Sequence, residues 1–211
     1  RAQAEQERDL LLASISHDLR TPLARLELAV ELLHGDSDLK HGIQQDLHEC
    51  DAIIGQFIAL ARAEHEQPYT KVDLLDLLQC SIEHAQRLEL PIAAQLQPCT
   101  CYGHPLALRR VLDNLLENAR RYGAPPLQLR LQPQGQQCCI ELRDHGPGIA
   151  SGAEQWLLQP FTRQDPARSR LGSGLGLAIV ARIMRVHAGT VSLSNHPDGG
   201  LQVTLHLPLA L

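Results

Sequence analysis

The stretch SISHDLRTPLARL, residues Ser14–Leu26, decides how the first part of the chain folds. Leucines recur around it every seven residues, at Leu12, Leu19, Leu26 and Leu33. This spacing predicts a helix that packs against partner helices as in a coiled coil. With Leu12 at heptad position a, His17 falls at the outward position f, and Thr21, four residues on, shares its face. We therefore expect a histidine that points to solvent from a rigid helix.

A helical hairpin is predicted for residues 1–66. The first helix is expected over about Glu5–His34, and the Gly-Asp-Ser-Asp stretch at 35–38 ends it. A second apolar pattern then follows, at Ile43, Leu47, Cys50, Ile54, Phe57 and Ala61. One apolar stripe per helix is too thin to be buried within a single hairpin, so we expect an antiparallel hairpin that dimerises into a four-helix bundle. Glu64–Pro68 is expected to be a linker.

Residues 67–211 are predicted to form a second domain of mixed helices and strands. Helices are expected over Leu74–Leu88, His104–Tyr122 and Leu175–His187. Strands are expected within Ile92–Tyr102, as one or two short pieces, and over Leu127–Leu131, Cys138–Arg143, Thr190–Asn195 and Leu201–Leu207. Gln-Pro-Gln-Gly and Pro-Asp-Gly-Gly would turn two hairpins, and Ser151–Asp165 is expected to be irregular. Mostly antiparallel strands with helices in layers indicate an α+β sandwich.

Composition narrows the class of protein. The 19 basic and 24 acidic residues give a net charge of −5, which argues against a nucleic-acid-binding surface. We find neither an apolar run long enough to cross a bilayer nor a secretory signal. The abrupt start within the polar stretch RAQAEQERD indicates a fragment of a longer protein.

The six cysteines form no Cys-x-x-Cys pair, so reduced and mostly buried thiols are expected. A metal pair at Cys99 and Cys101, on one strand face, is the weaker alternative.

His17 has neighbours that suit nucleophilic chemistry. A neutral imidazole is a good nucleophile near pH 7, and the adjacent Asp18 can orient the ring or accept its proton. Pro22 crowds the carbonyl of Asp18 and strains the helix beside the histidine. The alternative is a surface histidine on an ordinary dimer helix, but a helix-breaking proline at this place favours function.

The segment LDNLLENARRYG, Leu112–Gly123, places polar side chains on one helix face. Asn114 and Asn118 are four residues apart, and Arg121 and Tyr122 follow one turn later. Amide oxygens suit Mg²⁺, which takes its remaining ligands from water and phosphates, and a guanidinium suits phosphate. The alternative is a solvated polar face.

Two glycine-rich segments have features of ligand loops. In RDHGPGI, Arg143–Ile149, a carboxylate ends a strand and glycines let the backbone come close, which suits an exocyclic amine such as that of adenine. In LGSGLGLAIV, Leu171–Val180, a pliable loop runs directly into a helix whose N-terminus favours phosphate. It is neither a P-loop nor the dinucleotide fingerprint. A plain turn and a flexible linker are the respective alternatives.

Taken in order, the four segments resemble the H, N, G1 and G2 boxes of sensor histidine kinases, and the resemblance covers nearly the whole chain. The second helix, Asp46–Arg62, together with SHDLRTPLARLELA, looks most similar to the EnvZ-type osmosensor branch. The resemblance implies a dimeric helical hairpin followed by a Bergerat-type α/β sandwich that binds ATP and Mg²⁺.

The resemblance also implies a role for each matching residue. His17 would be the phosphoacceptor, Asp18 its acid/base partner, and Thr21 would support phosphatase chemistry. In the N box, the implied roles are Mg²⁺ for Asn118 with Asn114 nearby, phosphate for Arg121 and the adenine site for Tyr122. The remaining positions are Asp144 for the adenine amine, Gly146 and Gly148 for its turn, Gly172, Gly174 and Gly176 for the lid, and Phe161 for the F box. Glu117 departs from the osmosensor branch and fits the commoner Glu-Asn form of the N box. The three arginines of Arg163–Arg170 are expected to help hold phosphate.

The function that follows is ATP-dependent protein-histidine kinase activity. The chain would phosphorylate itself on His17, pass the group to an aspartate of a response regulator, and also dephosphorylate that regulator. Its place would be the cytoplasmic portion of an inner-membrane sensor. Two alternatives stay open: an ATPase that shares the nucleotide domain, such as a chaperone or topoisomerase relative, and a non-catalytic dimerisation scaffold.

Overall fold

The computed structural model describes residues 69–87, 90–162 and 174–210, together with seven positions nearer the start of the chain. These seven positions are Leu23, Leu26, Leu28, Val30, Ile43, Leu47 and Cys50. All seven are helical, in agreement with the two predicted helices. The predictions for His17, Asp18, Thr21 and the linker at Glu64–Pro68 lie outside the described residues.

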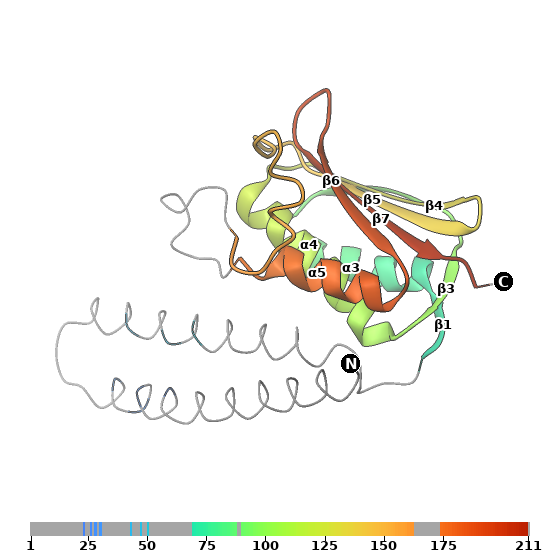
Figure 1. Ribbon diagram of the computed structural model, residues 1–211, viewed down its shortest axis with the longest axis horizontal. Coiled ribbons are helices and arrows are strands. Elements are labelled where there is room, and N and C mark those ends of the chain that lie inside the picture. Colours follow the sequence, from blue (N-terminus) through green and yellow to red (C-terminus); the bar gives the residue numbers. More distant parts are fainter. Residues whose placement is uncertain are drawn as a thin grey trace.

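The second part of the chain is a layer of helices packed on one face of a mixed sheet (Figure 1). The five-stranded sheet has the order β2-β4-β5-β7-β6, and a two-stranded sheet pairs β1 with β3. The strands are β1 (Thr70–Asp73), β2 (Ile92–Leu96), β3 (Thr100–Gly103), β4 (Leu127–Gln134), β5 (Gln137–Arg143), β6 (Thr190–Asn195) and β7 (Leu201–Pro208). The helices are α3 (Leu74–Arg87), α4 (Pro105–Tyr122) and α5 (Gly176–Val186). The predicted α+β sandwich is confirmed.

The core is aliphatic, as expected for a chain in which only 3% of the residues are aromatic. On β4, Leu127, Leu129 and Leu131 are buried and alternate with exposed residues, so one face of the strand points to the helices. The helices present apolar stripes to this face of the sheet; on α4 the stripe includes Val111 and Leu115. This two-layer burial fixes the relative positions of α4, α5 and the strand ends, where the predicted ligand-binding segments lie.

Three details of the sheet differ from the prediction or add to it. The strand β1 was not predicted, because its sequence Thr-Lys-Val-Asp has a single buried residue, Val72, and too little alternation to be recognised. The pairing of β2 with β4 is parallel. Strand β4 continues through Pro133, so the turn is tighter than Gln-Pro-Gln-Gly and centres on Gly135, whose φ is 61°. Because β2 pairs only with Leu127–Leu131, the missing N–H of Pro133 leaves no gap in that ladder.

A buried histidine joins the end of α5 to the start of α4. Nε2 of His187 accepts a hydrogen bond from the backbone N–H of His104 at 2.9 Å, so Nδ1 carries the proton and donates to the carbonyl of Ile183 at 2.7 Å. Burial lowers the pKa of His187, which keeps the ring neutral in this role. A Cβ at Gly103 would lie 2.6 Å from the ring, so only glycine permits this approach. The contact fixes the relative position of the two helices that border the candidate site.

The cysteines follow the prediction of reduced, mostly buried thiols. All six are free; Cys99, Cys101, Cys138 and Cys139 are buried, while Cys50 and Cys80 are exposed. Burial raises the pKa of Cys101 to about 11, so this thiol stays protonated near neutral pH. Among the described residues, no group of three or more histidine, cysteine or acidic side chains is arranged to hold a metal ion. Within the same described residues, no helix has the length and apolar character that a membrane span needs.

Candidate functional site

Three of the predicted segments meet at one end of the helical layer, although they are far apart in the sequence. A Cβ at Gly176, the first residue of α5, would lie 3.3 Å from Oδ1 of Asn114 and 3.6 Å from Oδ1 of Asn118. A Cβ at Gly146, after β5, would lie 2.8 Å from Cα of Gly123 at the end of α4. The fold therefore brings the asparagine face, the strand-end carboxylate and the glycine-rich helix start to one place.

The asparagines of α4 direct amide oxygens towards the start of α5. Nδ2 of Asn114 donates to the carbonyl of Arg110 at 2.8 Å, which turns its Oδ1 outwards to Gly176. The start of α5 adds the partial positive charge of a helix N-terminus. Oxygen ligands next to such a terminus fit a divalent cation bound together with phosphate.

Asp144 is 7% exposed and is held by two backbone N–H groups. Gly146 donates to Oδ1 at 2.7 Å and Leu201 donates to the same oxygen at 3.2 Å. Within the described residues both donors bind Oδ1, so Oδ2 is the oxygen left for an external donor. A carboxylate with one oxygen held by backbone N–H groups and a second oxygen able to accept suits recognition of an amine.

Two glycines outside the predicted set shape the surroundings of Asp144. A Cβ at Gly200, whose φ is +91°, would lie 1.8 Å from the carbonyl oxygen of Asp144. A Cβ at Gly123 would lie 2.7 Å from Cβ and Cγ of the same aspartate. From the sequence, Gly200 is predicted only as part of a hairpin turn and Gly123 only as the end of a helix. Neither pattern indicates that the glycine makes room for Asp144.

The glycine of the predicted turn, Gly148, has φ +70°, and its Cβ would lie 2.3 Å from Oδ1 of Asn195. Asn195 was not among the predicted site residues. The available signal was weak: at the end of β6 it shares the strand face of the buried Leu193.

Phe161 and Gly174, which lie near the two ends of the described residues that precede α5, are joined by a hydrogen bond. The N–H of Phe161 donates to the carbonyl of Gly174 at 3.0 Å. A Cβ at Gly174, with φ +67°, would lie 2.8 Å from the carbonyl oxygen of Thr162. Phe161 itself is 62% exposed. Gly172 and the arginines of 163–170 lie outside the described residues.

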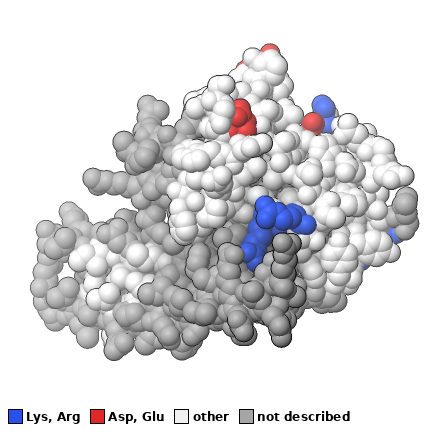
Figure 2. Space-filling model, viewed as in Figure 1, with Lys and Arg blue, Asp and Glu red and all other residues white. Residues whose placement is uncertain are grey.

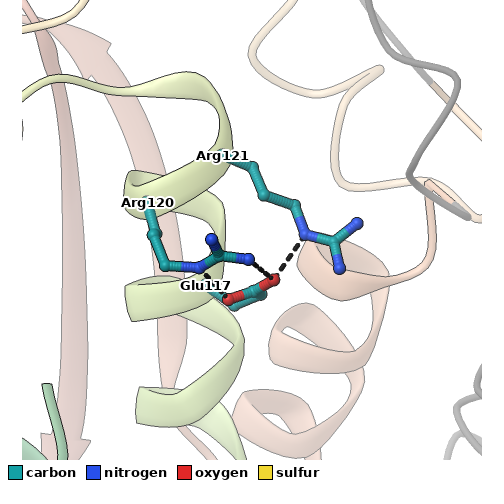
Figure 3. Close-up of polar contacts among 3 residues, drawn as sticks. All are labelled: Glu117, Arg120 and Arg121. Carbon is teal, nitrogen blue, oxygen red and sulfur yellow. Dashed lines mark hydrogen bonds and ion pairs between the residues drawn. The ribbon is translucent and has the colours of Figure 1, made fainter. Parts of the chain in front are cut away.

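Glu117 binds the two arginines that follow it on α4 (Figure 3). It accepts from Nε and Nη2 of Arg120, both at 2.7 Å, and from Nε of Arg121 at 2.5 Å. Hydrogen bonds from Arg120 first, and then from Arg121, lower the pKa of Glu117 to about 2. The guanidinium of Arg121 extends towards the start of α5 in Figure 3. Tyr122, the last residue of α4, is 46% exposed.

Charge is otherwise sparse on the face drawn in Figure 2. One basic patch lies over α5, and the acidic side chains are scattered. The described part of this face therefore has no extended surface of a single sign.

Comparison with known families identifies both parts of the chain. The family model of the His Kinase A (phospho-acceptor) domain matches residues 7–66. The model described as "Histidine kinase-, DNA gyrase B-, and HSP90-like ATPase" matches residues 103–211. The chain belongs to the sensor histidine kinases. Its first part is therefore a phosphoacceptor domain by family, and its second part is an ATPase-type domain.

Individual sensor histidine kinases match over nearly the whole chain. GtrS of Pseudomonas aeruginosa is 37% identical over 206 residues, which make up 96% of this chain and 42% of GtrS. The histidine kinase domain of the Escherichia coli osmosensor EnvZ has a TM-score of 0.56 at 34% identity, covering 70% of this chain and 92% of that domain. The ATP binding domain of PrrB from Mycobacterium tuberculosis has a TM-score of 0.59 at 31% identity, covering 69% and 100%. This chain spans less than half the length of curated relatives such as GtrS.

Proposed function

We propose that this chain is the catalytic core of an ATP-dependent protein-histidine kinase. It phosphorylates itself on His17, passes the phosphoryl group to an aspartate of a response regulator, and also dephosphorylates that regulator. The observation that carries the proposal is the convergence of Asn118, Asp144 and the start of α5 in one site. That site lies in a chain whose other part matches a phosphoacceptor domain.

In this proposal ATP binds with its adenine amine on Oδ2 of Asp144 and its phosphates at the start of α5. The turn at Gly146 and Gly148 shapes the adenine pocket, and Tyr122 lines it. Asn118 would hold Mg²⁺, with Asn114 beside it, and Mg²⁺ would neutralise charge on the phosphates. Arg121, whose guanidinium already extends towards α5, would contact phosphate. The lid would be formed by Gly172, Gly174 and Gly176 together with Phe161.

The reaction is an in-line displacement at the γ-phosphorus. A ring nitrogen of His17 forms the N–P bond while the bond from phosphorus to the β,γ-bridging oxygen breaks, and its electron pair leaves with ADP. Asp18 orients the imidazole and accepts its proton. Thr21, on the same face, would position water against a phosphoaspartate of the docked regulator. Positioning and charge neutralisation supply most of the catalysis.

The domain division that suits this proposal is 1–66 for the phosphotransfer hairpin and 67–211 for the ATP-binding domain. The hairpin would form a homodimer, because Leu26, at heptad position a, is 53% exposed in the single chain. By analogy with the longer relatives, the chain would be the cytoplasmic portion of an inner-membrane sensor.

An ATPase without a phosphoacceptor is the alternative. Residues 7–66 match the family model of the phospho-acceptor domain, which a plain ATPase does not need, so this match favours transfer to a histidine.

Incubation of the chain with γ-labelled ATP and Mg²⁺, followed by acid treatment, tests the proposal. We expect an acid-labile, alkali-stable label that disappears in His17→Gln, while ATP binding stays intact. His48→Gln, in the second predicted helix, is the matched control and should keep the label. Acid-labile label that persists in His17→Gln would overturn the assignment.

A further inference from the structure

We propose that Asn195 is a positioning residue that holds the nucleotide loop, Asp144–Ile149, in its ATP-binding conformation. This inference rests on the proposed function and adds a residue to the same site. Asn195 is the last residue of β6, and 46 residues separate it from the end of the loop that it holds.

The side chain of Asn195 makes two hydrogen bonds to one backbone unit. Its Oδ1 accepts from the N–H of Ile149 at 2.8 Å, and its Nδ2 donates to the carbonyl of Ile149 at 2.7 Å. The side-chain amide thus pairs with Ile149 as a neighbouring strand would, and satisfies both backbone polar groups of a residue that lies outside the sheet. An aspartate of the same size could accept but, when ionised, could not donate.

The other end of the loop is held by the register partner of Asn195. Asn195 lies opposite Leu201 in the β6–β7 ladder. The N–H of Asp144 donates to the carbonyl of Leu201 at 3.0 Å, and the N–H of Leu201 donates to Oδ1 of Asp144 at 3.2 Å. One pair of facing residues therefore anchors both ends of the nucleotide loop. The second anchor depends on a single side chain.

The approach of Asn195 also explains the glycine at the centre of the loop. A Cβ at Gly148 would lie 2.3 Å from Oδ1 of Asn195, inside any allowed contact distance. The space that a side chain would need is taken by the amide. Gly148 and Asn195 are therefore two parts of one local arrangement in the turn that follows Asp144.

Loss of the second anchor should weaken ATP binding without slowing the chemical step. A loop tied at one end samples more conformations, and ATP must then order it on binding. The phosphates are held elsewhere, by α4 and the start of α5, so the geometry of transfer is preserved. We expect Asn195→Ala to raise the KM and the Kd for ATP about fivefold, which is the size of effect that one net hydrogen bond gives. We expect kcat to stay within about twofold of the wild-type value.

The test compares three variants of the chain. Asn195→Ala removes both hydrogen bonds, and Asn195→Asp keeps the size but replaces the donor by an oxygen that faces the carbonyl of Ile149. Ser194→Ala is the matched control, because Ser194 is the exposed neighbour on the opposite face of β6. ATP binding is measured by calorimetry, KM and kcat by autophosphorylation, and loop order by exchange of the Ile149 amide hydrogen, all well below the unfolding temperature.

The expected result is a raised KM and faster Ile149 exchange in both Asn195 variants, with Ser194→Ala like the wild type. If Asn195→Asp weakens ATP binding as much as Asn195→Ala does, the hydrogen-bonding role is supported. If Asn195→Asp binds ATP like the wild type, that role is overturned. A fall in kcat at unchanged KM, or unchanged binding in both variants, also overturns it. If the wild-type chain fails to bind ATP, the proposed function fails too, so the two failures are distinguishable.

Discussion

Replacing Glu117 by glutamine is expected to destabilise the ATP-binding part of the chain in a pH-dependent way. The substitution keeps the size of the side chain and removes the charge that binds Arg120 and Arg121. In the folded protein the pKa of Glu117 is lowered from 4.5 to about 2. The carboxylate therefore stabilises the fold at any pH above about 4.5, and this contribution is lost as the pH falls towards 2.

The magnitude follows from the pKa change and from exposure. The full change would correspond to about 3 kcal/mol. The side chains of the three residues are 38–47% exposed, however, so solvent screens the charges. We therefore expect a decrease of about 1 kcal/mol in the free energy of unfolding at pH 7, reduced further in high salt.

Urea unfolding followed by fluorescence of Trp156, the single tryptophan of the chain, measures this part of the molecule. The matched control is Asp113→Asn on the same helix, where Asp113 faces Arg109 at 4.0 Å and both side chains are about half exposed. That control should cost less than about 0.5 kcal/mol. A Glu117→Gln effect no larger than the control, or one that is equally large at pH 2.5 and pH 7, would refute the reasoning.

Three further predictions test the proposed roles of individual residues. Gly200→Ala adds a collision with the carbonyl of Asp144 to the strain of a positive φ, whereas Gly199→Ala, with φ +89° and open space around it, adds the strain alone. Thermal unfolding should therefore show Gly200→Ala to be the less stable, with a cost of about 1–3 kcal/mol for the strain in each. Asp144→Asn should weaken ATP binding about tenfold or more in calorimetry, because a charged acceptor for the adenine amine is lost; equal affinity would place adenine elsewhere. Thr21→Ala should lose regulator dephosphorylation far more than autophosphorylation, and a parallel loss of the two rates would instead indicate a structural hydroxyl.

Most secondary structure of the second part could be predicted, because each element has a periodic pattern of its own. Leu127, Leu129 and Leu131 alternate with polar residues along β4, and the apolar residues of α4 recur at helical spacing. The predicted bounds of α4 and β6 agree with the structure to within one residue. Strand β1 was missed because four residues with one buried valine contain no period to detect.

The candidate residues were predicted from their chemistry and spacing and from the family resemblance, but the contacts that hold them were not predicted. Residues four apart lie on the same face of any α-helix, so the neighbouring positions of Asn114 and Asn118 were determined by the local sequence. The position of their amide oxygens next to Gly176 was not determined locally, because it results from the packing of α4 against α5. Glu117 was noted only as a departure from one branch, and its binding of Arg120 and Arg121 became visible in the side-chain geometry.

The sequence by itself indicated the heptad pattern, every strand of the second part except β1, and the carboxylate and amides that we propose to bind ATP and Mg²⁺. These properties depend on side-chain chemistry and on periods of a few residues. Only the tertiary structure decided that Leu201, 57 residues after Asp144, donates to its carboxylate, and that Asn195 pairs with Ile149. Such contacts follow from the order of strands in the sheet, which places β7 between β5 and β6. Because strand order results from burial of all the apolar faces together, no single segment contains it.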